Sequence, residues 1–262
     1  MTIALRLHQP PAAAPSGLLA LAREVTGFLD GEIGPALPGW HQAFGDNQQA
    51  LGELHAALAE RFAEAGPPFW AVRMWTNLLW QPAYLAVCGV HFGGVAPALD
   101  GLSQQRKGVD IAACRHDGRP HLAQGHELEL IAPAGAALRA FADSVFAEVN
   151  RFEKLKRLPA LRLLTDRMLG CMLMLQRKRP DLTAADIRAI CDAWLAAMGL
   201  TGQGDLESLL LADGREVLLI ARKGCCLDYL PFPGTYCASC PKQDDDVRKT
   251  RQREDALAML AD

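Results

Sequence analysis

The chain has little net charge, and this lack excludes one broad class of partner. Its 262 residues carry a formal charge of −3 at pH 7, with a pI near 6.2. Binding to nucleic acid needs a concentrated positive field. The one basic stretch near the C-terminus, residues 248–253, follows three aspartates. We therefore expect no nucleic-acid partner.

The chain also lacks a long apolar run. Its longest stretch without acidic or basic residues, Met74 to Leu99, contains Asn, Gln, His, two prolines and three glycines. A membrane-spanning helix needs about 20 mostly apolar residues. A signal peptide is not evident either, because polar residues and prolines at 8–11 follow Arg6. We expect no transmembrane segment and a cytoplasmic protein, with peripheral association at the inner membrane as a variant.

Nucleotide-binding fingerprints are missing as well. The sequence has no G-x-G-x-x-G motif, no phosphate-cradling loop and no evident flavin motif. It also offers no set of nucleophile, base and orienting residue. If the protein handles electrons, they are expected to arrive from another protein.

What the sequence does contain is typical of a folded domain. Half of its residues are hydrophobic and 22% are charged. Apolar periodicity predicts helices over residues 16–29, 46–65, 69–80 (ending there or continuing past Pro82), 136–155, 161–176, 183–198 and 244–260. Strands are predicted at 109–115 and 122–131, joined as a hairpin by Asp117-Gly118, and at 217–221. The fold class expected is α+β, a helix-dominated single domain with a small antiparallel hairpin.

The cysteines are distributed unevenly. Four of the eight are scattered, and the other four lie within sixteen residues of one another. The clustered ones are Cys225, Cys226, Cys237 and Cys240. Disulfides are rare in the cytoplasm, so such a cluster is more typical of metal binding than of thiol oxidation.

The spacing C-C-x10-C-x2-C fits two kinds of metal centre. Four thiolates bind structural zinc or an iron–sulfur cluster. Adjacent side chains of an extended strand point to opposite faces, so Cys225 and Cys226 share a site only if the backbone turns, which Gly224 would permit. A two-iron cluster is wider than a zinc site. We therefore hypothesise that the adjacent pair binds one iron, and Cys237 with Cys240 binds the other.

This pattern resembles the C-terminal signature of the FhuF-type ferric-siderophore reductases. The likeness includes a basic residue shortly before the cysteine pair and Tyr229 shortly after it, and it covers about 20 residues. Upstream it is diffuse, limited to an aromatic-rich segment with Arg73, Trp75 and Trp80 and to a D-G-R-P turn. The resemblance implies that Cys225, Cys226, Cys237 and Cys240 bind a 2Fe–2S cluster.

The resemblance also implies an activity and a division of the chain. The expected activity is one-electron reduction of siderophore-bound Fe(III) to Fe(II), with an external donor such as a ferredoxin, a flavodoxin or a reductase. Residues 1–221 would form the substrate-docking body, and residues 222–262 the cluster segment packed on it. Two alternatives remain: an interaction protein with structural zinc, and a 2Fe–2S electron-transfer protein that acts on another protein.

Several charged and aromatic residues are further candidates. Arg222, Lys223 and Lys242 flank the cysteines and are expected to tune the cluster or steer a substrate, or else to be solvated surface charges. Arg73 can pair with ligand oxygens, or form a surface salt bridge. Trp75 can line a substrate pocket, or belong to the core.

Overall fold

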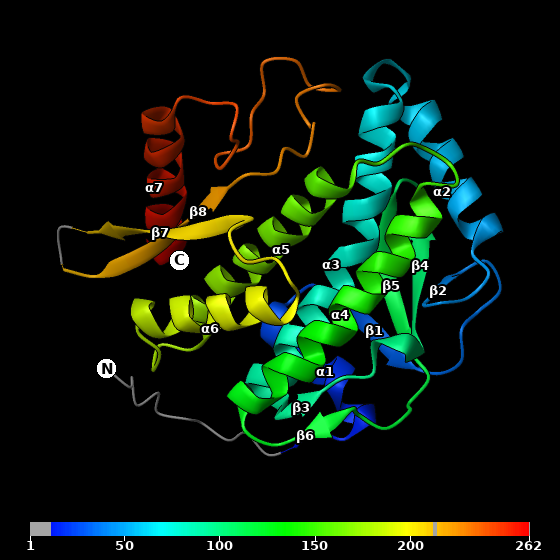
Figure 1. Cartoon of the computed structure of the whole chain (residues 1–262), viewed down its shortest axis with the longest axis horizontal. Helices are drawn as coiled ribbons and strands as arrows, with labels where there is room; N and C mark the ends of the chain where they lie inside the picture. Colours follow the sequence, from blue (N-terminus) through cyan, green and yellow to red (C-terminus); the bar gives the residue numbers. More distant parts are fainter. Residues whose placement is uncertain (1–11, 212–213, 262) are drawn as a thin grey trace.

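The computed structural model describes residues 12–211 and 214–261. The expectation about a signal peptide, which rested on Arg6 and residues 8–11, lies outside these ranges. The α-helices are α1 (Pro15–Thr26), α2 (Gln48–Arg61), α3 (Pro67–Gly93), α4 (Glu127–Val149), α5 (Arg157–Lys178), α6 (Ala184–Ala197) and α7 (Asp245–Ala261), with short 3-10 helices at Ala63–Ala65 and Leu99–Gly101 (Figure 1). The strands are β1 (Asp30–Ile33), β2 (His41–Gln42), β3 (Val95–Ala96), β4 (Leu102–Lys107), β5 (Asp110–His116), β6 (Ala123–Gln124), β7 (Gly204–Leu210) and β8 (Glu216–Arg222).

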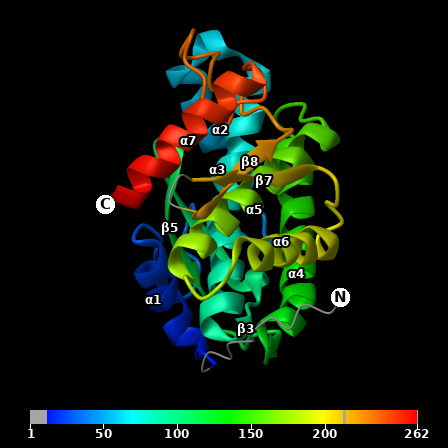
Figure 2. The same ribbon diagram turned by 90° about the vertical axis from the view of Figure 1, so that its left-hand side faces the viewer.

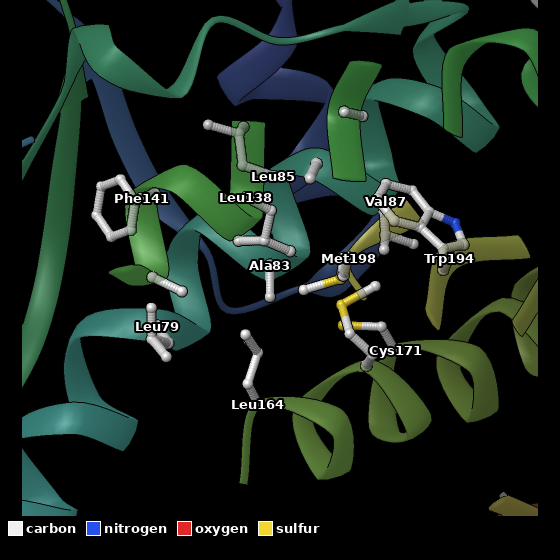
Figure 3. Packing of buried hydrophobic residues seen from close by; sticks show 14 of the residues in the cluster. Leu79, Ala83, Leu85, Val87, Leu138, Phe141, Leu164, Cys171, Trp194 and Met198 are labelled. Atoms are coloured by element: carbon white, nitrogen blue, oxygen red, sulfur yellow. The ribbon is translucent and has the colours of Figure 1, made fainter. Parts of the chain in front are cut away.

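The long helix α3 forms the centre of the hydrophobic core. It is apolar on nearly all sides, and it is therefore buried on nearly all sides rather than along one stripe. Helices α1, α2, α4 and α5 pack against α3, and α6 packs on α4 and α5. In Figure 3, Ala83 of α3 lies among Leu138 of α4 and Leu164 and Cys171 of α5. One continuous core thus joins the first half of the chain to the second.

Pro82 lies in the middle of α3 without ending it. A proline has no N–H, so the carbonyl of Leu78, four residues earlier, loses its partner within the helix. The buried Gln104, on β4, supplies the missing donor: its Nε2 donates to Leu78 O at 3.0 Å and to Oε1 of Gln81 at 3.0 Å. The helix therefore continues past Pro82 to Gly93.

The main sheet has the strand order β1-β5-β4-β2. Strand β5 pairs antiparallel with β4 across a turn at Gly108, and parallel with β1. The predicted hairpin of residues 109–115 with 122–131 is therefore wrong. Residues 122–131 contribute β6, which pairs with β3, and the beginning of α4. Asp117 accepts a hydrogen bond from the backbone N–H of Arg119, which closes a loop rather than a hairpin.

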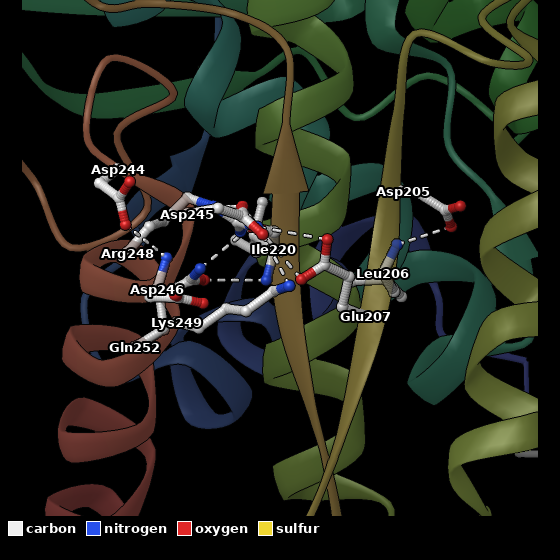
Figure 4. Close-up of polar contacts among 10 residues, drawn as sticks. All are labelled: Asp205, Leu206, Glu207, Ile220, Asp244, Asp245, Asp246, Arg248, Lys249 and Gln252. Atoms are coloured by element: carbon white, nitrogen blue, oxygen red, sulfur yellow. Dashed lines mark hydrogen bonds and ion pairs between the residues drawn. The ribbon is translucent and has the colours of Figure 1, made fainter.

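The last hairpin, of β7 and β8, is covered on the outer edge of β8 by two glutamines. Gln176 of α5 accepts from Leu218 N and donates to Glu216 O, both at 3.2 Å. Gln252 of α7 accepts from Ile220 N at 2.9 Å and donates to Ile220 O at 3.2 Å (Figure 4). These amides stand in for a neighbouring strand, so the edge is not left unpaired.

Arg248 fixes α7 to both strands of this hairpin. Its Nη1 donates to Ile220 O at 3.0 Å, and its Nη2 lies 3.2 Å from both carboxylate oxygens of Glu207 on β7 (Figure 4). Helix α7 lies beside the hairpin in both ribbon views (Figures 1 and 2). The segment between β8 and α7, residues 223–244, is thereby anchored at its two ends.

A buried polar network joins α3, α4 and α6. Nε1 of Trp194 donates to Nε2 of His91 at 2.9 Å, so Nδ1 of His91 carries the proton that it shares with Oε2 of Glu127 at 2.8 Å. Burial lowers the pKa of His91, which favours this neutral ring. Arg179 adds an Nη1 at 3.4 Å from the same Glu127 oxygen. The charge of Glu127, whose side chain is fully buried, is thus compensated.

The structure confirms the expected fold class, a helix-dominated α+β domain with small sheets. The helices predicted over 161–176, 183–198 and 244–260 are present as α5, α6 and α7. Thr183 and Asp186 form a capping box at the start of α6. The division between residues 221 and 222 stays a prediction.

One described helix, α4, is long and apolar enough to cross a membrane by length and composition. A single helix of this kind is weak evidence, because the core helix of a folded domain passes the same test. Helix α4 packs against α3 and α6 and contributes Leu138 and Phe141 to the core. This finding is consistent with the expected absence of a transmembrane segment.

Candidate metal centre

The four clustered cysteines lie on the segment that joins β8 to α7. This segment extends toward the end of α2 (Figure 2). There the rings of Phe232 and Phe62 are 6.3 Å apart. Cys240 is 3% exposed, whereas Cys225, Cys226 and Cys237 are half-buried. The cluster is thus near the surface but shielded from bulk water on the side of the core.

The other four cysteines have a different environment. They are buried among core side chains, and burial raises the pKa of every one of these thiols; they are Cys88, Cys114, Cys171 and Cys191. A thiol with a raised pKa is a poor metal ligand and a poor nucleophile at neutral pH. The clustered cysteines differ in that they share one segment and three of them are only half-buried, so they are the candidate ligands.

The adjacent cysteines share a turn centred on Leu227. This residue has a φ of 62°, in the left-handed region that a residue with a side chain rarely adopts. The turn directs the backbone N–H of Leu227 to the sulfur of Cys225, and that of Asp228 to the sulfur of Cys226. Such N–H donors favour thiolate over thiol. The pKa of Cys226 is lowered overall, whereas at Cys225 burial outweighs the N–H donor and raises the pKa.

Gly224 has a different role from the one expected. Its φ is not in the left-handed region, and the turn lies at Leu227 instead. A Cβ on Gly224 would lie 2.6 Å from Oδ2 of Asp166 and 3.1 Å from the backbone N of Leu163, both on α5. The glycine therefore allows the cysteine segment to approach α5 closely.

A direct thiol contact crosses the segment between Cys226 and Cys237. A hydrogen bond from Cys237 lowers the pKa of Cys226 to about 6, and the same bond raises the pKa of Cys237. The hypothesis that Cys225 and Cys226 bind the same iron stays a prediction, because the contact observed joins one member of each pair.

The donor set fits a four-thiolate centre in its chemistry. The four thiols interact electrostatically with one another, and backbone N–H groups serve two of them. Within residues 12–211 and 214–261, no three His, Cys, Asp or Glu side chains are grouped closely enough to hold a metal ion. Ligation therefore requires the cysteine side chains to turn toward one another around the metal.

Of the three basic residues that flank the cysteines, Arg222 and Lys242 lie close to a cysteine and Lys223 does not. Nη1 of Arg222 donates to Sγ of Cys237 at 3.4 Å. Nζ of Lys242 lies 4.5 Å above the ring of Tyr229 and interacts electrostatically with Cys225. Lys223, in contrast, donates to the carbonyl of Gly202 at 2.8 Å, in the connection between α6 and β7. Lys223 therefore anchors the segment.

The two candidates on α3 differ in accessibility. The guanidinium of Arg73 lies over Phe69 and forms an ion pair with Asp228 at 3.4 Å, beside the cysteine turn. Trp75 is only 1% exposed, and its Nε1 donates to Ala160 O at 2.9 Å. Trp75 thus holds α3 to α5 from within the core, and it also borders the cavity between α3, α5 and the cysteine segment, so its contact with a substrate stays a prediction.

A cavity of about 300 Å³ opens between α3, α5 and the cysteine segment. The sulfur-bearing residues Cys226 and Cys237 line it, together with Arg73, Arg167, Arg222 and Asp166. Sequence reasoning missed Asp166 and Arg167. The only signal for Asp166 was that it is the one carboxylate in the apolar helix predicted over 161–176.

A second cavity, of about 760 Å³, lies on the other side of the C-x2-C turn. Its walls are the outer edge of β8, the facing sides of α5 and α7, and the beginning of α6. Ala238 and Ser239, between the last two cysteines, border it, and Ser239 borders the first cavity as well. Both volumes are in the range of small-molecule sites.

No protein-family model matches the chain, and no solved structure matches it significantly.

Proposed function

We propose that the protein is a ferric-siderophore reductase of the cytoplasm. It would transfer one electron to siderophore-bound Fe(III) through a 2Fe–2S cluster held by Cys225, Cys226, Cys237 and Cys240. The observation that supports this most is the turn at Leu227, which supplies N–H donors to the sulfurs of an adjacent cysteine pair beside a cavity. The FhuF-type signature supplies the substrate class.

The chemistry of iron release explains why one electron is enough. Siderophores hold Fe(III) with hard anionic oxygens, and Fe(II), which carries less charge, binds the same oxygens more weakly. Reduction therefore releases the iron and leaves the chelator intact. A bound 2Fe–2S cluster would supply a one-electron carrier at this position.

The residues around the cysteines serve binding and electrostatics. The N–H groups of Leu227 and Asp228 and the guanidinium of Arg222 would compensate thiolate charge. Lys242, at the outer side, is placed to attract an anionic chelate or an acidic donor protein. With no nucleotide fingerprint in the sequence, the electron would come from a ferredoxin, a flavodoxin or a reductase.

The test is an anaerobic redox titration. Protein purified without oxygen is reduced with dithionite, freed of excess reductant, and mixed with a panel of ferric siderophores while the visible spectrum is followed. We expect a reddish-brown protein that bleaches on reduction and regains its colour when Fe(II) is released. Reoxidation only by a partner protein would show an electron-transfer protein instead.

The ligand assignment has its own test. Serine at any one of the four clustered positions is expected to change or abolish the cluster spectrum. The matched control is Cys191→Ala, because Cys191 is buried far from the turn in the middle of α6. If all four single variants kept the native spectrum, the ligation would be refuted. A colourless protein that contains zinc would favour the structural-zinc alternative.

A further inference from the structure

Asp166 is a buried carboxylate on an otherwise apolar face of α5. Its side chain is 8% exposed, in a helix whose neighbouring positions Leu163, Leu164 and Leu169 belong to the core. Burying a charge is costly unless a partner compensates it. A specific interaction must therefore offset the burial of Asp166.

The partners of Asp166 belong to the beginning of the cysteine segment. Its Oδ2 accepts from Nε of Arg222 at 2.9 Å and from the backbone N–H of Gly224. Any side chain at position 224 would collide with this oxygen. The carboxylate thus fixes both the guanidinium and the backbone immediately before the first cysteine.

The guanidinium of Arg222 contacts a cysteine sulfur as well as Asp166. With Nε held by Asp166, Nη1 donates to Sγ of Cys237 at 3.4 Å, and the side chain is only 12% exposed. The planar guanidinium can contact two groups in fixed directions at once, whereas a lysine ammonium lacks this fork. The other carboxylate oxygen of Asp166, Oδ1, is buried and has no hydrogen-bond partner. Asp166 also lines the smaller of the two cavities.

We propose that Asp166 is a positioning residue that holds the guanidinium of Arg222 against Cys237 and thereby raises the reduction potential of the cluster. This inference rests on the proposed function. A positive charge and an N–H donor at a ligand sulfur stabilise the reduced cluster, which carries one more negative charge. Asp166 acts through Arg222 and touches neither substrate nor sulfur.

The direction in which substitutions of Asp166 shift the reduction potential distinguishes a positioning role from a purely electrostatic effect of its charge. Removing a negative charge near the cluster would by itself raise the potential. Asp166→Ala also releases Arg222, so positioning predicts a lower potential. Asp166→Asn keeps an acceptor for Nε and loses the charge, so its potential is expected to be equal to or above that of the wild type. Asp166→Glu restores the carboxylate and is expected to recover most of the wild-type value.

The experiment is a spectroscopic potential titration of the anaerobic protein and its variants. We expect Asp166→Ala and Arg222→Gln each to shift the reduction equilibrium about tenfold toward the oxidised form, which is about 59 mV for one electron. In the Arg222→Gln background Asp166→Ala has no guanidinium to release, so it should no longer lower the potential. Arg162→Gln, which removes a charge from the same helix without a sulfur contact, is the matched control.

The possible results are distinguishable. A potential in Asp166→Ala that is unchanged or raised overturns the proposal, even if the cluster and the reductase activity are intact. If Asp166→Ala does not fold, the test uses Arg222→Lys, which keeps the positive charge but lacks the planar fork. A wild-type reduction potential in this variant overturns the proposal, and a lowered potential supports it. Absence of a cluster in the wild type would instead refute the proposed function, before any variant is compared.

Discussion

The backbone N–H of Asp228 donates to the sulfur of Cys226, and it can do so because Leu227 adopts a left-handed conformation. A non-glycine residue in this region costs about 1–3 kcal/mol. The surrounding contacts, which include the ion pair of Asp228 with Arg73, hold the turn in place. The left-handed conformation of Leu227 thus accounts both for the backbone strain and for the direction of the N–H groups toward the sulfurs.

Substitutions at Leu227 are expected to separate backbone conformation from side-chain identity. Leu227→Gly keeps the turn accessible, so the metal should be retained. Leu227→Val keeps an apolar side chain but is β-branched, which makes a positive φ unfavourable, so the sulfurs should lose their donors. We expect iron to be lost to a chelator at least tenfold faster from the valine variant. Leu230→Val, without a positive φ, is the control, and equal rates in all three would contradict the turn argument.

The pH dependence of stability is expected to carry a signature of Asp166. Burial raises the pKa of its carboxyl to about 6, against an ordinary value of 3.8. Between these values the folded metal-free protein binds more protons than the unfolded chain, so the contribution of Asp166 becomes more destabilising as pH rises.

The variant Asp166→Asn mimics the protonated carboxyl at every pH. We expect its free energy of unfolding, relative to that of the wild type, to rise by an amount on the order of 3 kcal/mol between pH 4 and pH 7. Urea titrations of both metal-free proteins measure this difference. A difference that is independent of pH would show that the carboxyl is not perturbed.

The buried network around Glu127 is expected to be the most sensitive polar group of the core. Glu127→Ala removes the acceptor of His91 and leaves Arg179 without one of its partners. The expected loss in the free energy of unfolding is about 3–5 kcal/mol. Glu129→Ala, on the same helix turn but exposed, should change it by less than about 0.5 kcal/mol. Similar small losses in both variants would contradict this account.

The contact of Gln104 with α3 is expected to depend on Pro82. In the wild type, Gln104→Leu leaves the carbonyl of Leu78 without its donor, which should cost about 1–3 kcal/mol. In a Pro82→Ala background, an N–H four residues after Leu78 restores the helical bond, so the same change should cost less. Denaturant unfolding of the four proteins gives the coupling energy, and strictly additive effects would refute the proposed compensation.

The sequence predicts the helices well where local signals agree. For α6 the capping box of Thr183 and Asp186, the apolar spacing and Gly199 all indicate the same helix. The β4 strand was missed because its sequence, LSQQRK, is polar; Ser103 and Gln104 are nevertheless buried, since their partners come from other elements. Asp117-Gly118 has hairpin composition but closes a loop between β5 and β6.

The four clustered cysteines stand out in the sequence by their spacing, whereas the residues that contact them do not. Their role as metal ligands stays a prediction. The contact of Asp166 with Arg222 joins residues 56 positions apart and depends on how α5 packs against β8, which no local pattern encodes. For the same reason the sequence could not decide whether Lys223 acts on the cluster or is a surface charge; the structure places its ammonium at Gly202 O.

The central claim is that four cysteines near the C-terminus hold a redox-active 2Fe–2S cluster. Its most direct test is the iron, acid-labile sulfide and zinc content of anaerobically purified protein, together with its electron paramagnetic resonance spectrum after reduction with dithionite. We expect about two iron and two sulfide per chain and the signal of a reduced 2Fe–2S cluster. Stoichiometric zinc without sulfide, or no metal and no signal, would contradict the claim.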